Sequence, residues 1–134
     1  MIVVDTNVLV YFFLRTEFTD PVDTLFKKDP EWIAPLLWRS EFRNVLALYI
    51  RKDLIDLQKA IEIQEEAESL LAGNEYEVPS QVVLSLARET GCSAYDCEFL
   101  ALAKQQGIKL VTADRKLIEA APEVAVSVEG IGGD

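Results

Sequence analysis

Short runs of β-branched and aliphatic residues alternate with longer amphipathic segments, and this alternation constrains the fold more than any other feature. Five segments have the length and composition of buried strands, at residues 2–4, 31–34, 76–78, 109–112 and 124–128. Helical periodicity and capping residues predict helices at residues 6–14, 19–28, 36–51, 55–71, 80–90, 93–106 and 114–120. Strands that alternate with helices favour an α/β fold with a mainly parallel sheet covered on both faces.

The length and composition predict one soluble domain. With 134 residues, half of them hydrophobic, the chain is long enough to bury a core. We expect a single domain over residues 1–134, with a frayed glycine-rich tail from about residue 129. No apolar run approaches the roughly 20 residues that span a bilayer, and the N-terminus has no positively charged signal region. A cytoplasmic location is therefore expected.

The complete absence of histidine excludes several catalytic mechanisms. Ser-His-Asp and Cys-His nucleophiles, imidazole acid–base pairs and histidine-ligated zinc all need that residue. The spacing of Cys92 and Cys97 fits no common zinc or redox motif, so we interpret both as small buried hydrophobic residues. An enzyme of this composition has to use carboxylates, lysines and hydroxyls.

The formal net charge of −10 allows two interpretations. A general nucleic-acid binder usually carries a basic face, which this balance does not favour. The excess of acids either serves solubility or reflects acids gathered at a site that binds metal cations. Composition alone does not choose between the two.

Two aspartates follow predicted strands. Asp5 comes directly after the strand at residues 2–4, and Asp114 lies just past the strand at residues 109–112. Ligands of parallel α/β sheets bind beyond the carboxyl ends of the strands. Both acids are therefore expected where this architecture places its chemistry, although either could instead serve only as a helix N-cap.

A third acid, Glu41, interrupts an apolar helical stripe. It lies four residues from both Leu37 and Val45, on a stripe that continues to Leu48. A lone buried carboxylate is costly. Glu41 therefore needs a partner, which could be a core arginine or tyrosine, or a cation.

A fourth acid, Asp96, begins the apolar stripe of another helix. Phe99, Leu100 and Ala103 follow it by three, four and seven residues. Ser93 and Asp96 also match the S-x-x-D spacing of a capping box, which requires no chemistry. Taken singly, each of the four acids has such a structural explanation.

Taken together, four carboxylates that converge on one place would repel each other. A divalent cation removes that repulsion, and oxygen ligands without histidine or cysteine suit Mg²⁺ or Mn²⁺ better than zinc. Acid clusters of this kind hold metal ions for phosphodiester hydrolysis, in which the metal activates a water and neutralises phosphate charge.

Four sequence blocks, VVDTNVL, WRSEFRNVL, SAYDCEFLALA and LVTADRKL, occur in this order between residues 2 and 128. They resemble the PIN domain, and in particular the VapC-type toxins of VapBC toxin–antitoxin pairs. The resemblance implies a three-layer α/β/α fold and a Mg²⁺- or Mn²⁺-dependent endoribonuclease. In that reaction a metal-activated water attacks an RNA phosphodiester in line.

The resemblance also implies the roles of individual residues. The catalytic and metal-binding acids would be Asp5, Glu41, Asp96 and Asp114, with Asp5 and Asp96 as direct ligands and with Asn7 and Thr112 in support. Some relatives carry a further acid where Lys116 and Leu117 stand here, and Glu98 is a possible extra ligand displaced around its helix. Basic residues near these blocks either contact RNA phosphates or are ordinary surface charges; they are Arg39, Arg43, Arg115 and Lys116.

The family resemblance further suggests a homodimer and an antitoxin protein as partners. Phe12–Leu14 and the amphipathic helix from Ile55 are expected to offer apolar surface for such contacts. Alternatives within the same fold are a housekeeping RNA-processing nuclease and a non-catalytic binding module. A haloacid dehalogenase phosphatase would need the motif D-x-D, but Asn7 stands here at the position of its second aspartate. A receiver domain would need paired acids that are absent from this sequence.

Overall fold

The computed structural model describes residues 1–129. In that part of the chain the elements are β1 (Ile2–Val4), α1 (Thr6–Phe13), α2 (Thr19–Lys28), β2 (Trp32–Pro35), α3 (Trp38–Arg51), α4 (Leu57–Leu70), β3 (Glu75–Tyr76), α5 (Ser80–Thr90), α6 (Ala94–Gln106), β4 (Leu110–Val111), α7 (Arg115–Ala120) and β5 (Ala125–Val126). All the predicted elements exist, with ends shifted by one or two residues. Most of the predicted glycine tail lies outside the described residues.

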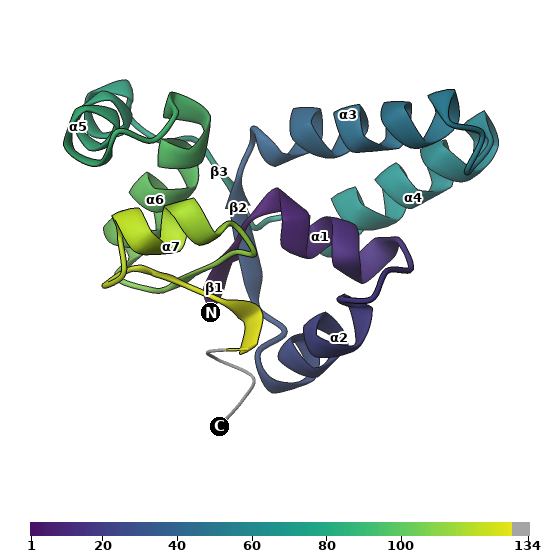
Figure 1. The fold of residues 1–134 in the computed structure, drawn as a ribbon, viewed down its shortest axis with the longest axis horizontal. Coiled ribbons are helices and arrows are strands. Elements are labelled where there is room, and N and C mark those ends of the chain that lie inside the picture. Colours follow the sequence, from purple (N-terminus) through teal and green to yellow (C-terminus); the bar gives the residue numbers. More distant parts are fainter. Residues whose placement is uncertain (130–134) are drawn as a thin grey trace.

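The five strands form one parallel sheet in the order β3-β2-β1-β4-β5. Helices α1–α4 lie on one side of it and α5–α7 on the other (Figure 1), so the predicted three-layer α/β/α fold is confirmed. After β1 the chain adds β2 and β3 toward one edge of the sheet, and β4 and β5 then extend the sheet on the other side of β1. The crevice at the carboxyl ends of β1 and β4 is therefore the switch point where such sheets bind ligands.

Helix α6 forms the centre of one helical layer. Every residue from Phe99 to Ala103 is buried, and the helix packs on α5 and across β1, β2 and β4. Cys97 is buried and Cys92 half-buried, and both are free thiols. Because α6 packs tightly on the sheet, its first turn, which contains Asp96, is fixed in position.

Helix α3 buries a different stripe from the predicted one. Trp38, Phe42 and Leu46 face the core, whereas Leu48 is 39% exposed. The predicted stripe was wrong by one residue, because the true core stripe and its neighbour are both apolar. Glu41 consequently lies beside the core stripe, at the border between the core and solvent.

The prediction that Phe12–Leu14 offers surface to partners is wrong for Leu14, which is buried. Phe12 and Phe13 are half-buried and pack against the core. The Phe12 ring lies against the Trp32 ring with centroids 5.1 Å apart. Phe13 meets Phe42 edge to face at 6.1 Å. These aromatic contacts fasten α1 to β2 and α3, and so they hold the start of α1 above the sheet.

The helical hairpin of α3 and α4 does present apolar side chains to solvent. Ala60, Ile63 and Ala67 bury the inner face of α4, while four large residues of the hairpin are between 39% and 64% exposed: Leu48, Leu54, Leu57 and Ile61. None of the helices in residues 1–129 is long and apolar enough to cross a membrane.

Candidate active site

Asp5 stands where β1 ends and α1 begins. Its backbone N–H donates to the carbonyl of Val111 at 3.0 Å, which continues the pairing of β1 with β4 by one residue. One carboxylate oxygen caps α1 by accepting the Thr6 N–H at 2.8 Å. The other accepts the Thr112 hydroxyl at 2.7 Å. The side chain is thus held from both sides of the switch point and is only 7% exposed.

Thr112 joins the acids that follow β1 and β4. Its fully buried hydroxyl donates to Asp5 and accepts the Asp114 N–H at 3.0 Å. Asn7 reinforces this link, because its amide lies 3.3 Å from the Thr112 hydroxyl and 3.4 Å from Asp5, and it accepts the Ala113 N–H at 3.1 Å. Asp114 caps α7 by accepting the Lys116 N–H at 3.0 Å.

Glu41 reaches the same crevice from α3. Its Oε1 accepts the Thr6 hydroxyl at 2.7 Å. The Asp5–Thr6–Asn7 turn therefore supplies one acid itself, binds Glu41 through Thr6 and binds Thr112 through Asn7. The expected core arginine or tyrosine partner is replaced by Thr6. Glu98, from the first turns of α6, is close enough to Glu41 to raise its pKa electrostatically.

Asp96 enters the crevice from the first turn of α6. Ser93 caps this helix by accepting the Asp96 N–H at 3.0 Å. The cap uses the backbone N–H of Asp96, so the carboxylate of the same residue can still lie in the cleft.

The four carboxylates line a single cleft of about 430 Å³. The remaining lining residues are neutral, and they include neither lysine nor arginine: Thr6, Asn7, Val10, Tyr11, Asn44 and Val45. The cleft therefore gathers negative charge without a basic side chain on its wall.

Burial and the charge of neighbouring carboxylates raise the pKa values of Asp5, Glu41 and Asp96. Burial raises the pKa of Asp5 to about 6, although hydrogen bonds from Thr112 and Thr6 act in the opposite direction. Burial also raises the pKa of Glu41, with the nearby charge of Asp96 adding to the effect. The pKa of Asp96 is raised by burial and then by the charge of Asp114. The ionised cluster is thus electrostatically unfavourable without a compensating cation.

The donor set matches the preference of a hard divalent cation. Mg²⁺ takes oxygen ligands and is usually held by one or two carboxylates while it keeps several waters. Within residues 1–129, no group of three or more acidic or cysteine side chains already has the spacing that holds a metal ion. The cleft suits an ion that is ligated by few carboxylates and retains its water.

The four basic residues lie in different surroundings. Arg39 forms a two-pronged ion pair with Glu75 at 2.6 and 2.7 Å and also approaches Glu68 at 3.2 Å, so its guanidinium is committed to α4 and β3. Arg43 lines the groove between α3 and α4. Arg115 and Lys116 are exposed at the start of α7, beside Asp114.

Three polar cleft residues were missed by the sequence analysis, although the sequence holds a signal for each. Thr6 lies between Asp5 and Asn7. Tyr11 follows Asn7 by four residues and Asn44 follows Glu41 by three, which are the spacings that share one helical face.

Solved structures share this fold. The crystal structure of PAE2754 from Pyrobaculum aerophilum superposes with a TM-score of 0.76 at 24% identity, covering 98% of this chain and 86% of that one. FitAcB from Neisseria gonorrhoeae gives 0.76 at 19% identity, with 96% and 98% covered. FitAB bound to an IR36 DNA fragment gives 0.75 at 21% identity, with 96% and 95% covered. At this level of identity the likeness shows the fold.

The sequence comparison identifies the family. No curated protein sequence matches this chain. The family model of the PIN domain matches residues 2–122, which include the whole acidic cleft. The chain therefore belongs to the PIN domain family, a family of nucleases.

Proposed function

We propose that this protein is a Mg²⁺- or Mn²⁺-dependent endoribonuclease whose active site is the acidic cleft. The observation that carries the proposal is the convergence of Asp5, Glu41, Asp96 and Asp114 on one cleft, to whose wall residues 1–129 contribute no basic side chain. Such an arrangement is costly for the fold unless a cation binds there.

The acids divide the work between holding a cation and placing water. Asp5 and Asp96 are the proposed direct ligands, and Glu41 and Asp114 complete the cluster or orient water. A bound Mg²⁺ or Mn²⁺ lowers the pKa of a coordinated water and neutralises charge on the phosphate. Thr112 and Thr6 keep the Asp5 and Glu41 carboxylates in fixed orientations through bonds of 2.7 Å each.

Substrate RNA has to approach a protein whose net charge is −10. Arg115 and Lys116 lie directly after Asp114, so they are the proposed phosphate contacts nearest to the cleft in sequence. Arg39 is left out of this role because Glu75 and Glu68 already engage it.

We further propose the biological role of a toxin in a type II toxin–antitoxin pair, acting in the cytoplasm as a homodimer that an antitoxin protein inhibits. The groove between α3 and α4, of about 260 Å³, supports an apolar partner contact. Ile61 on its wall is exposed, and the buried Oε1 of Gln64 accepts no hydrogen bond within the described part of the chain.

Cleavage of RNA by the purified protein tests the enzymatic proposal. Wild type, Asp5→Asn and Asp96→Asn are prepared identically and incubated with RNA in Mg²⁺, in Mn²⁺ and in a chelator. We expect cleavage that requires metal and that falls by at least about a hundredfold in both variants, because each loses a charged ligand.

Asp20→Asn is the matched control, since Asp20 is an exposed acid at the start of α2. It should cleave like wild type. Equal cleavage by all four proteins would point to a contaminating nuclease, and metal-independent cleavage would contradict the proposed chemistry.

A further inference from the structure

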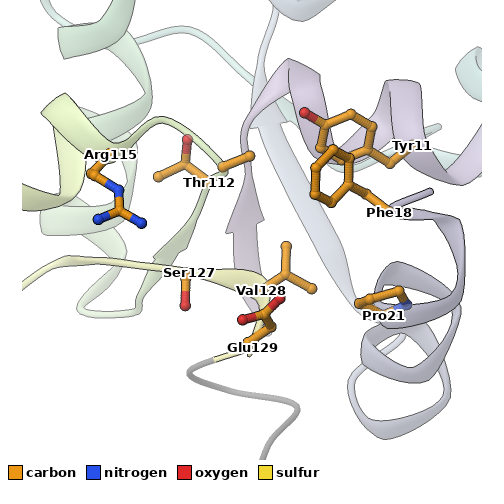
Figure 2. Close-up of a pocket in the computed structure, with 9 residues that line it drawn as sticks. Tyr11, Phe18, Pro21, Thr112, Arg115, Ser127, Val128 and Glu129 are labelled. Atoms are coloured by element: carbon orange, nitrogen blue, oxygen red, sulfur yellow. The ribbon is translucent and has the colours of Figure 1, made fainter. Parts of the chain in front are cut away.

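A second pocket adjoins the acidic cleft. It has a volume of about 210 Å³ and lies between α1, the start of α2, the start of α7 and the segment after β5 (Figure 2). Tyr11 and Phe18 form one wall, and Thr112 and Arg115 lie across from them. Tyr11 lines both this pocket and the acidic cleft, while the Thr112 hydroxyl donates to Asp5. The pocket and the cleft thus share one lining residue, Tyr11, and are linked by the Thr112–Asp5 hydrogen bond.

The aromatic wall is set in place before any ligand arrives. The rings of Tyr11 and Phe18 lie with centroids 4.8 Å apart and planes tilted by 38°. Phe18 is 44% exposed, which is unusual for a phenylalanine. The turn that carries it is fastened by hydrogen bonds of Thr16 and Thr19, including a 2.8 Å bond from the Thr19 hydroxyl to the Tyr11 carbonyl. An exposed ring is therefore held rigidly beside the cleft.

One end of this pocket offers a positive charge to a phosphate. Among the described residues that line the pocket, Arg115 is the one cation, and it follows Asp114 directly. Glu129 also lines the pocket and repels anions, so a phosphate is drawn to the Arg115 end. An aromatic platform with a nearby arginine is the combination that binds one nucleotide of a single strand.

We propose that this pocket holds an unpaired base of the RNA next to the phosphate that is cleaved, stacked on Phe18 and Tyr11, with Arg115 contacting the phosphate of that nucleotide. The inference rests on the proposed ribonuclease function and adds a subsite to it: a pocket for one splayed base, built from Phe18, Tyr11 and Arg115. The volume of about 210 Å³ lies below the roughly 300–1,000 Å³ of typical ligand pockets, which suits one planar base.

Fluorescence of 2-aminopurine tests the stacking directly, because the base is quenched when it stacks on an aromatic ring. A short oligouridine with one central 2-aminopurine is titrated with the Asp96→Asn protein, in which cleavage is suppressed. We expect saturable quenching. Adding Phe18→Ala should weaken binding by about 5- to 100-fold and remove most of the quench, and Phe18→Trp should restore both.

Matched variants separate the pocket from general surface effects. Leu84→Ala removes an even more exposed apolar side chain from α5 and should change nothing. Arg115→Gln should weaken binding and flatten its salt dependence, whereas Lys59→Gln, which alters an exposed residue of α4 outside the pocket lining, should keep the quench. Free 2-aminopurine riboside should not be quenched at the same concentration.

Quenching that is unchanged by Phe18→Ala and Arg115→Gln would overturn the inference, as would no quenching at all or equal quenching of the free riboside. Cleavage of the same RNA by the protein with Asp96 intact is assayed in parallel. Stacking without cleavage would contradict the proposed function and leave the pocket standing, so the two failures are distinguishable.

Discussion

Two features of Asp5 act in opposite directions on its ionised form: helix capping favours the charge, and burial opposes it. Asp5 caps α1 through the Thr6 N–H, and it lies buried among other carboxylates at the switch point of the sheet. Burial outweighs its hydrogen bonds and raises its pKa to about 6 from the ordinary 3.8. The difference corresponds to roughly 3 kcal/mol against the ionised form. A cation in the cleft would remove that cost.

The raised pKa of Asp5 predicts how stability depends on pH in metal-free buffer. Between about pH 4 and pH 6 the folded state binds more protons at Asp5 than the unfolded state does, so its contribution to stability falls as pH rises. Asp5→Asn cannot titrate. The free energy of unfolding of wild type, measured by urea denaturation, should therefore drop relative to that of Asp5→Asn by up to roughly 3 kcal/mol across this window.

The same comparison with Asp20→Asn provides the control, because Asp20 is exposed and lies outside the cleft. It controls for the removal of one acid from the surface. A difference between wild type and Asp5→Asn that does not change with pH would mean that burial does not perturb the Asp5 carboxyl, and the electrostatic argument for a cation would fail.

The acidic residues could be found from the sequence because each places a charge directly beside, or within, an apolar segment. Asp5 and Asp114 follow apolar strands, and Asp96 begins an apolar stripe. The partners of these acids could not be found in the same way. Thr112 meets Asp5, and Arg39 meets Glu75, only after the sheet has brought distant segments together.

At the scale of elements, the first turn of α6 connects helix capping to the site. Ser93→Ala removes the bond of 3.0 Å from the Asp96 N–H. We expect the free energy of unfolding to fall by about 1 kcal/mol in urea denaturation. The pKa of Asp96 should also rise further, since the Ser93 side chain lowers it in wild type.

Ser93→Thr keeps a capping hydroxyl and serves as the matched variant; it should recover most of the lost stability. If Ser93→Ala and Ser93→Thr were equally destabilised, packing around residue 93 would explain the effect and the capping interpretation would be wrong.

Helix α3 shows why the register of an amphipathic helix is hard to predict. Leu37 and Val45 are apolar, but so are Trp38, Phe42 and Leu46 one position along. The second set is buried, whereas Leu37 and Val45 are only partly buried at the edge of the core. Tertiary packing decided between two adjacent stripes. The position of Glu41 at the cleft could still be predicted, because it borders both.

At the scale of the whole molecule, the alternation of strands and helices was enough to predict a parallel sheet with helices on both faces. The strand order β3-β2-β1-β4-β5 could not be predicted from it, since local patterns carry no information about which strands pair. The order matters because it places β1 beside β4 and so unites Asp5 with Asp114. It also closes the pocket between Phe18 and Arg115, which are far apart in sequence.

Binding of a divalent cation by the carboxylates of this cleft underlies the proposed chemistry. It can be measured by calorimetric titration with Mn²⁺ of wild type, Asp5→Asn, Asp96→Asn and the control Asp20→Asn. Mn²⁺ should bind to wild type and Asp20→Asn, and its affinity should be at least about tenfold lower in the two cleft variants. Equal Mn²⁺ affinity in all four proteins would contradict binding by these carboxylates.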